Sequence, residues 1–198
     1  MATAHLILNT ASKMGFYGVM PQSYGPQIRG GEAAAHVSIG TSPIGTVAFQ
    51  KDLAVCFRFS DALRFAKEFS VAPHAGVFHG KEEAALPDLL RAKKGWTVSI
   101  PFREIFEKEG FPEIAKNVFV FGMLLKVLGW NLQEGIHCVQ ESFAHKAAAI
   151  VATNLKAMEA GYQYLDAVWL PFKVPPPKSE GKREVLSGNE ACARGAVD

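Results

Sequence analysis

Residues 21–31 read PQSYGPQIRGG, and residues 32–39 continue as EAAAHVSI. The first part holds two prolines and three glycines, a density that predicts a loop without regular structure. The second part alternates well enough between apolar and polar positions to predict a strand. The loop therefore separates two series of predicted elements, one upstream and one downstream of it.

Upstream of the loop, the sequence predicts a helix over residues 2–14. Gly15 is a suitable residue for the C-terminal end of this helix, and residues 16–20 predict a short extended segment. The apolar face of the helix consists of Leu6, Ile7, Ala11 and Met14.

Downstream of the loop, strand and helix patterns alternate. Residues 53–57 form a short apolar run that predicts a buried strand, and residues 61–69 predict an amphipathic helix. Two or three short strands are expected within residues 70–100, the last of them at residues 96–100. Elements in this order are typical of a parallel or mixed sheet.

The second half of the chain reads as helical. A helix that begins at Pro112 and runs to Leu128 is apolar on most sides, so we expect it to be buried. A second helical pattern runs from Ile136 to Tyr162, and Gly161 is expected to bend or end it. Strands that alternate with helices before this helical pair predict an α/β fold, a Rossmann-like open sheet flanked by helices.

The C-terminal region reads as a spacer followed by a short segment. Residues 171–182 are PFKVPPPKSEGK, whose prolines favour extended polyproline geometry. We expect a proline-rich linker over residues 169–182. Residues 183–198 are too few to fold alone, and we interpret them as the truncated start of a second domain.

Composition limits the functions open to the chain. Its 198 residues have a net charge of +2 with dispersed basic residues, which argues against nucleic-acid binding. The three cysteines form no C-x-x-C pair, so neither an iron–sulfur cluster nor a structural zinc is expected within the chain. The main apolar run, residues 118–128, is too short for a membrane span. We expect a cytoplasmic protein with reduced thiols and no membrane contact.

The loop carries the main candidate for a functional side chain. Arg29 stands before Gly30 and Gly31, where other groups can approach the main chain closely. A guanidinium in this setting suits a phosphate, a carboxylate or the loop of a neighbouring subunit. The alternative is a turn whose Arg29 pairs locally with Glu32 or another acid, and the residues alone favour this alternative.

Other candidate sites give weaker signals. The glycines of the loop lack the spacing of a dinucleotide-binding fingerprint and lead into a strand instead of a helix. No set of serine or cysteine with histidine and an acid is marked as a catalytic triad. Glu82 and Glu83 are expected to be solvated in a charged loop. The residues by themselves therefore indicate an α/β domain, a linker and the start of a second domain, but no reaction.

Two stretches resemble a known family. Residues 21–39, followed by Ser42-Pro43-Ile44, resemble the signature of the γ domain of pyruvate, 2-oxoglutarate and indolepyruvate ferredoxin oxidoreductases. Residues 116–126 and 154–164 are similar to the closing helices of that domain. The resemblance implies a γ domain over residues 1–168 that lacks its first strand, because the chain begins inside the first helix of the family.

Residues 186–197 resemble the opening of the α subunit, which contacts the aminopyrimidine end of thiamine diphosphate in that family. The resemblance marks Gly188, Asn189 and Glu190 as the start of the α domain, and the chain ends before the Tyr-Pro-x-Thr-Pro element that follows. A γ domain before an α domain is typical of the 2-oxoglutarate-type enzymes, which favours 2-oxoglutarate as the substrate, with pyruvate and indolepyruvate as alternatives.

The resemblance implies oxidative decarboxylation of a 2-oxoacid, with coenzyme A as acyl acceptor and ferredoxin as electron acceptor. Thiamine diphosphate, magnesium and iron–sulfur clusters are then expected in the complete complex, in the α continuation, a thiamine-pyrophosphate-binding β subunit and cluster-bearing parts. This chain alone is expected to bind none of them and to be inactive, with no catalytic residue. The expected interface or coenzyme A-proximal residues are Tyr24, Gly25, Arg29, Gly30 and Gly31. The alternative function is a stand-alone interaction or small-molecule-binding α/β domain without redox activity.

Overall fold

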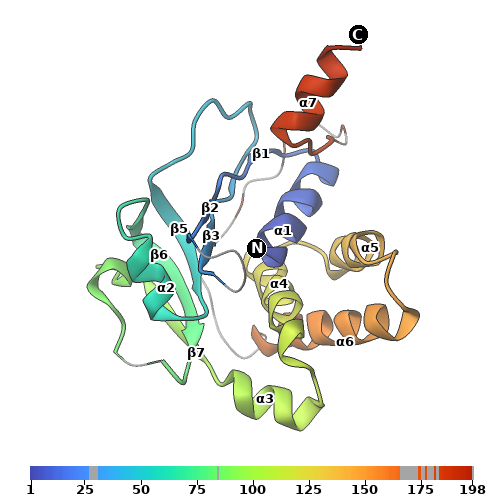
Figure 1. Ribbon diagram of the computed structural model, residues 1–198. Helices are drawn as coiled ribbons and strands as arrows, with labels where there is room; N and C mark the ends of the chain where they lie inside the picture. Colours follow the sequence, from blue (N-terminus) through green and yellow to red (C-terminus); the bar gives the residue numbers. More distant parts are fainter. Residues whose placement is uncertain are drawn as a thin grey trace. The chain divides into compact units, whose positions relative to one another are not determined.

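The computed structural model describes residues 1–26, 31–83, 85–165, 174, 177, 181 and 183–197. The chain divides into two compact units, and each unit is made of segments that are not continuous in sequence. The sheet unit comprises Met1, Pro21–His36 and Thr46–Lys116. The helical unit comprises Ala2–Met20, Val37–Gly45 and Asn117–Asp198. Figure 1 shows the elements of both units.

The sheet unit is built on a parallel three-stranded sheet in the order β5-β6-β7. The strands are β5 (Gln50–Cys56), β6 (Ser70–Gly80) and β7 (Trp96–Ile100). Both strand pairs are parallel, so each connection crosses back along the sheet. The connecting and following helices are α2 (Phe59–Arg64), η1 (Asp88–Leu90), α3 (Phe102–Glu109) and η2 (Glu113–Ala115).

A small apolar core joins α2 and η1 to this sheet. It consists of the buried side chains Cys56, Phe59, Val77 and Leu90. On β6, Gly76 leaves room for the Trp96 ring of β7, because a Cβ at this position would collide with the indole. Trp96 also makes an edge-to-face contact with Phe78, with ring centroids 5.2 Å apart.

A short antiparallel hairpin also belongs to the sheet unit. Its strands are β2 (Gln22–Tyr24) and β3 (Ala33–Ala35), and Gln22 lies opposite Ala35. With three residues in each strand, the hairpin has few ladder bonds of its own.

The helical unit contains α1 (Ala2–Lys13), α4 (Lys116–Val127), α5 (Leu132–Ser142), α6 (Ala148–Tyr164) and α7 (Gly188–Gly195); the first residue of α4 is assigned to the sheet unit. It also holds the antiparallel pair β1 (Tyr17–Val19) and β4 (Ser38–Gly40). Most of α4 is buried, as its apolar sequence predicts.

Glycines allow α4 and α6 to approach each other closely. A Cβ on Gly122 of α4 would collide with the backbone of Met158, and a Cβ on Gly161 of α6 would collide with the backbone of Phe119. Gly161 therefore neither bends nor ends its helix, which continues to Tyr164. It is a packing residue whose missing side chain brings two helix backbones together.

The structure confirms the mixed α/β class and several elements, including α1, β1, β7 and the burial of α4. Other predictions were wrong. Residues 22–24 form β2 inside the stretch expected to be irregular. The single strand expected over residues 32–39 is split into β3 and β4, because one part pairs with β2 and the other with β1.

The helical half also differs from the prediction. The pattern from Ile136 to Tyr162 is interrupted at residues 143–147, which separate α5 from α6. Pro112 precedes a 3-10 turn, and α4 itself begins at Lys116. The helix α3 was not anticipated, and α2 ends at Arg64 instead of residue 69. The proline-rich linker lies mostly outside the described residues, so its extended geometry stays a prediction.

Candidate functional site at the β2–β3 loop

The residues predicted to form the site cluster around the turn of the β2–β3 hairpin. Tyr24 ends β2 with 66% of its surface exposed, and Gly25 follows it directly. Gly31 leads to β3. Arg29 and Gly30 lie outside the described residues, so the role predicted for Arg29 stays a prediction.

Backbone and side-chain contacts close the base of this loop. The backbone N–H of Gly25 donates to the carbonyl of Glu32 over 2.7 Å. Within the described residues, positive φ angles occur at Gly15, Gly110 and Gly129, so Gly25 does not use a left-handed conformation. Its small size matters instead, since a Cβ on Gly25 would lie 2.5 Å from the Glu32 carboxylate.

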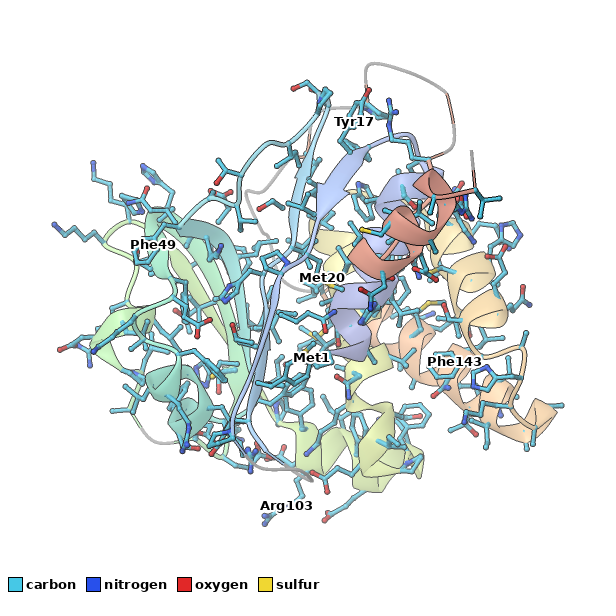
Figure 2. The ribbon with its side chains drawn as sticks, turned by 45° about the horizontal axis from the view of Figure 1, so that its top comes forward. Met1, Tyr17, Met20, Phe49, Arg103 and Phe143 are labelled. Atoms are coloured by element: carbon cyan, nitrogen blue, oxygen red, sulfur yellow. The ribbon has the colours of Figure 1, made fainter. Side chains whose placement is uncertain are left out.

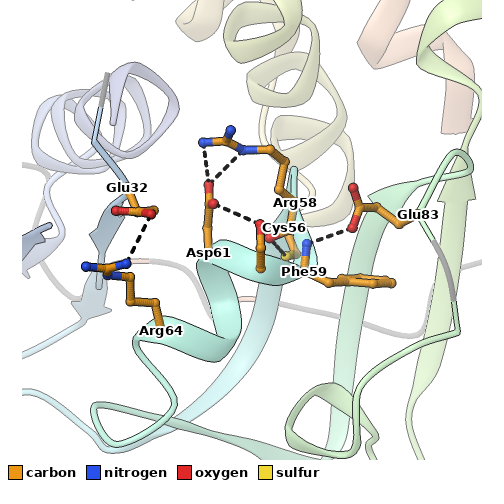
Figure 3. Close-up of polar contacts among 8 residues, drawn as sticks. Glu32, Cys56, Arg58, Phe59, Asp61, Arg64 and Glu83 are labelled. Carbon is orange, nitrogen blue, oxygen red and sulfur yellow. Dashed lines mark hydrogen bonds and ion pairs between the residues drawn. The ribbon is translucent and has the colours of Figure 1, made fainter. Parts of the chain in front are cut away.

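The carboxylate of Glu32 is held by α2. Its Oε1 lies 3.4 Å from Nη1 of Arg64, the last residue of that helix (Figure 3). Glu32 was the acid suggested as a local partner for Arg29, and the described structure gives it a different arginine. The second oxygen, Oε2, is buried and has no hydrogen-bond partner within the part of the chain that is described.

A second acid, Glu68, contacts both arms of the hairpin. Its Oε2 accepts a hydrogen bond of 2.5 Å from Oγ of Ser23 on β2. The same oxygen lies 3.5 Å from Nε2 of His36, which follows β3. Burial, and after it the charge of Lys51, lowers the pKa of His36, while Glu68 acts in the opposite direction. His36 is therefore mostly neutral near pH 7.

The carboxyl ends of the parallel strands form a second candidate region, because such sheet edges are common ligand sites in α/β folds. Cys56 ends β5, and its thiol donates to the carbonyl of Arg58 over 3.0 Å. Burial, with a contribution from the charge of Glu83, raises the pKa of Cys56 to about 11. A thiol of this kind stays protonated at neutral pH and is a poor nucleophile or metal ligand.

Glu82 is exposed at this edge, as expected, and Glu83 is half-buried, but both carboxylates also accept backbone hydrogen bonds. Glu83 accepts the backbone N–H of Phe59 over 2.7 Å at the start of α2 (Figure 3). Glu82 accepts the backbone N–H of Arg103 over 3.1 Å at the start of α3. Partial burial opposes the change, but hydrogen bonds from the backbone, with Lys116 and Arg103 nearby, lower the pKa of Glu82. The two carboxylates thus cap the N-terminal ends of α2 and α3.

The segment resembling the start of an α subunit forms an exposed helix. Gly188, Asn189 and Glu190 make up the first turn of α7. Ser187 and Glu190 form a reciprocal capping box there, and the backbone hydrogen bond from Ser187 lowers the pKa of Glu190. In this chain Glu190 therefore has a local structural role, and its expected role at the start of an α domain stays a prediction.

Arg183 attaches this segment to the C-terminal end of α1. Its backbone N–H donates to the carbonyl of Ser12 over 2.9 Å, and its Nε donates to the carbonyl of Gly15 over 3.1 Å. Its guanidinium lies 3.4 Å from the ring centroid of Tyr17, which Figure 2 labels on β1. One arginine thus caps a helix end and stacks on an aromatic ring.

The described residues provide no group of three histidine, cysteine, aspartate or glutamate side chains that could hold a metal ion. Cys56 and Cys138 are buried free thiols, and Cys192 is an exposed one. They do not fit the thiolate set that an iron–sulfur cluster requires. No helix in the described ranges combines the length and apolar character of a membrane span.

The fold defines the class of this protein: a mixed α/β domain with a parallel sheet and a short antiparallel hairpin. Residues 1–164 match the family described as pyruvate ferredoxin/flavodoxin oxidoreductase. The chain belongs to this family, as the resemblance of its loop and closing helices had predicted.

A curated relative is the 2-oxoglutarate oxidoreductase subunit KorA of Mycobacterium tuberculosis. It is 33% identical over 87 residues, which cover 42% of this chain and 13% of that subunit. The chain therefore spans only a small part of the length of this relative.

Three solved structures share the fold. A 2-oxoglutarate:ferredoxin oxidoreductase from Magnetococcus marinus, with 2-oxoglutarate, coenzyme A and succinyl-CoA bound, matches with a TM-score of 0.83 and 16% identity. That match covers 100% of this chain and 34% of the other. The γ subunit of a keto/oxoacid ferredoxin oxidoreductase from Geobacter sulfurreducens has a TM-score of 0.62, 19% identity, and coverages of 84% and 90%. A pyruvate oxidoreductase subunit from Thermotoga maritima has a TM-score of 0.56, 15% identity, and coverages of 81% and 86%.

Proposed function

We propose that the chain supplies the γ-type part of a 2-oxoacid:ferredoxin oxidoreductase, with 2-oxoglutarate as the favoured substrate. The observation that carries the proposal is the family match over residues 1–164, to which the 33% identity with KorA adds the preference for 2-oxoglutarate. Coenzyme A would accept the acyl group and ferredoxin the electrons. The three free thiols agree with a cytoplasmic location.

The proposed domain organisation follows the sequence. Residues 1–168 form the γ domain, residues 169–182 the linker, and residues 183–198 the start of an α domain. The Magnetococcus marinus match supports this division, because it extends over the whole chain and therefore beyond residue 164, where the family match ends. The α continuation and a thiamine-pyrophosphate-binding β subunit would be the partners.

Within that complex, the hairpin loop would contact coenzyme A or a neighbouring subunit. Tyr24, Gly25, Arg29, Gly30 and Gly31 are the residues proposed for this contact. The exposure of Tyr24 and the hydrogen bond between Gly25 and Glu32 support it, because they leave Tyr24 accessible beside a closed loop base. Arg29 would meet a phosphate of coenzyme A or a partner carboxylate.

This chain would position reactants and not perform the bond-breaking steps. Thiamine diphosphate would supply the electron sink for decarboxylation when bound in the complete complex. The described residues offer no ligand set for that cofactor's metal or for an iron–sulfur cluster. The contribution of the γ-type part would therefore be binding energy and orientation at the entrance used by coenzyme A.

Reconstitution tests the substrate and the partners. The chain is expressed with its α continuation and the β subunit, and reduction of ferredoxin is measured with 2-oxoglutarate, pyruvate and indolepyruvate in the presence of coenzyme A. We expect the highest kcat/KM with 2-oxoglutarate. Failure of the chain to assemble with these subunits would reject the proposal, and a higher kcat/KM with pyruvate would reject the preferred substrate.

The role of Arg29 has its own test in the assembled enzyme. Loss of a charge-assisted contact to a phosphate should weaken coenzyme A binding by about 1.5–3 kcal/mol, roughly ten- to a hundredfold. Arg29→Lys should recover part of this loss, because an ammonium cannot make the paired contact of a guanidinium. An Arg29→Ala enzyme with unchanged KM for coenzyme A and unchanged subunit association would show that Arg29 does not act at this interface.

A further inference from the structure

The hairpin that presents the loop needs support from outside its own strands. β2 and β3 contain three residues each, and isolated hairpins of this kind are marginal in water. The geometry of the two arms must therefore depend on what holds them. Within the sheet unit, that support comes from residues 64–68, at and just after the end of α2.

Glu68 holds both arms at once. It accepts a hydrogen bond from Ser23 on β2, and its Oε2 lies 3.5 Å from Nε2 of the mostly neutral His36 beyond β3. The backbone N–H of His36 in turn donates to the carbonyl of Pro21 over 3.0 Å, which closes the open end of the hairpin. One carboxylate thus joins the two strands at the end away from the turn.

Arg64 holds the hairpin nearer the turn. Its guanidinium pairs with Glu32, and the carbonyl of the same Glu32 accepts the backbone N–H of Gly25. Arg64 and Glu68 flank Phe65, whose side chain is only 6% exposed. Because Phe65 is buried, an apolar side chain between the two charged residues anchors the segment that carries them.

We infer that Arg64 and Glu68 are positioning residues for the arms of the β2–β3 hairpin, residues 22–25 and 32–36. Neither lies within the 21–39 signature, and neither is proposed to touch a ligand. The inference rests on the proposed function, because it states how the arms on each side of the loop proposed to meet coenzyme A or a partner are held. Both side chains are partly exposed, so their contacts add little to global stability and act mainly on local geometry.

The chain offers a matched control on the same helix. Arg58 also carries a partly exposed guanidinium and also pairs with an acid, but this acid is Asp61 within α2 itself (Figure 3). Arg58 is the N-cap residue of α2, and its removal lowers the net charge of the chain by the same amount as removal of Arg64. It leaves the contacts of Arg64 with Glu32 and of Glu68 with Ser23 in place, which separates positioning from a general electrostatic effect.

The first experiment measures amide hydrogen exchange in the full 198-residue chain. Arg64→Ala and Glu68→Gln should each speed exchange at Gly25 and His36 by about two- to fivefold, the range expected when an exposed ion pair stops opposing a local opening. Arg58→Ala should leave these amides unchanged, and Arg64→Lys should restore much of the protection. Equal effects of Arg58→Ala and Arg64→Ala, or no effect of either, would overturn the inference. Amides of β6 serve as an internal check that the fold is intact.

The second experiment uses the assembled enzyme. Arg64→Ala should raise the KM for coenzyme A about two- to fivefold with little change in kcat, and Arg64→Lys should recover part of the affinity. Arg58→Ala should behave like the unmodified enzyme.

If Arg29→Ala weakens coenzyme A binding while Arg64→Ala changes neither KM nor exchange, the inference is wrong and the proposed function stands. If exchange responds as expected but Arg29→Ala changes neither KM nor assembly, the positioning role stands and the proposed role of the loop fails.

Discussion

The β2–β3 hairpin and the α4–α6 crossing are held together by opposite means. The hairpin depends on partly exposed charged side chains, chiefly Glu32 with Arg64, and Glu68 with both arms. The crossing depends on the absence of side chains, since Gly122 and Gly161 let two helix backbones meet among buried apolar residues. The first arrangement can shift without unfolding the domain, whereas the second tolerates no added atom.

This contrast separates stability from function in the chain. Buried, closely packed helices contribute strongly to the free energy of unfolding. Unfolding exposes their apolar groups to water and breaks their close packing. Exposed ion pairs contribute little to that energy but can select one conformation of a loop. A residue of the crossing should therefore affect folding, and a residue of the hairpin should affect binding.

Gly161→Ala should produce the largest effect. In an exposed helix this change would stabilise by up to about 1 kcal/mol, but here the new Cβ meets the backbone of Phe119. We expect a net loss of about 2–3 kcal/mol in the free energy of unfolding, measured by urea denaturation. Gly195→Ala is the control, because Gly195 of α7 faces open space. A stable Gly161→Ala chain would show that the two helices are not in backbone contact.

Arg183→Ala tests a polar contact within the helical unit. It removes the hydrogen bond to the Gly15 carbonyl and the stacking on Tyr17, so residues 183–197 should detach more often from α1. Thermolysin should then cleave at Leu186 roughly tenfold faster. The cleavage rate of Arg183→Lys should fall between those of Arg183→Ala and the unmodified chain, because lysine keeps the charge but loses the planar stack. An unchanged cleavage rate would mean that Arg183 does not hold the segment.

Glu83→Ala tests whether the frame of the hairpin depends on the cap of α2. The substitution leaves the N–H of Phe59 without its 2.7 Å acceptor and should cost about 1 kcal/mol of unfolding free energy. Because α2 carries Arg64, exchange at Gly25 should also rise. Glu104→Gln, which alters an exposed pair with Lys81, is the control. A loss of unfolding free energy without any change in amide exchange at Gly25 would indicate that the hairpin is held independently of α2.

The pH dependence of the hairpin should be the smallest effect. Burial and Lys51 lower the pKa of His36 from its ordinary value of 6.5, with Glu68 opposing them. The neutral form is therefore favoured in the folded chain, and the associated stability is present above pH 6.5 and is lost as the pH falls through the lowered pKa. Urea midpoints measured between pH 7.5 and 5 should show this loss, and His36→Gln should flatten it. If the stability of His36→Gln falls by the same amount between pH 7.5 and 5, the loss comes from groups other than His36.

Local patterns in the sequence were sufficient for the elements that depend on near neighbours. The periodicity of α1, the strand at Trp96–Ile100 and the apolar run of α4 are set by residues a few positions apart, so they could be predicted. The 21–39 signature identified the family for the same reason, because its residue order is itself the signal.

Contacts between distant residues were decided only by the tertiary structure. The split of residues 32–39 arises because Ala33–Ala35 and Ser38–Gly40 find different partner strands, which no local alternation specifies. Gly161 looks like a helix end until Phe119 is placed against it. Likewise, Glu68 lies 45 residues from Ser23, and only folding brings its carboxylate to the hairpin. The sequence by itself determined the class and the family, while long-range pairing decided which side chains hold the loop.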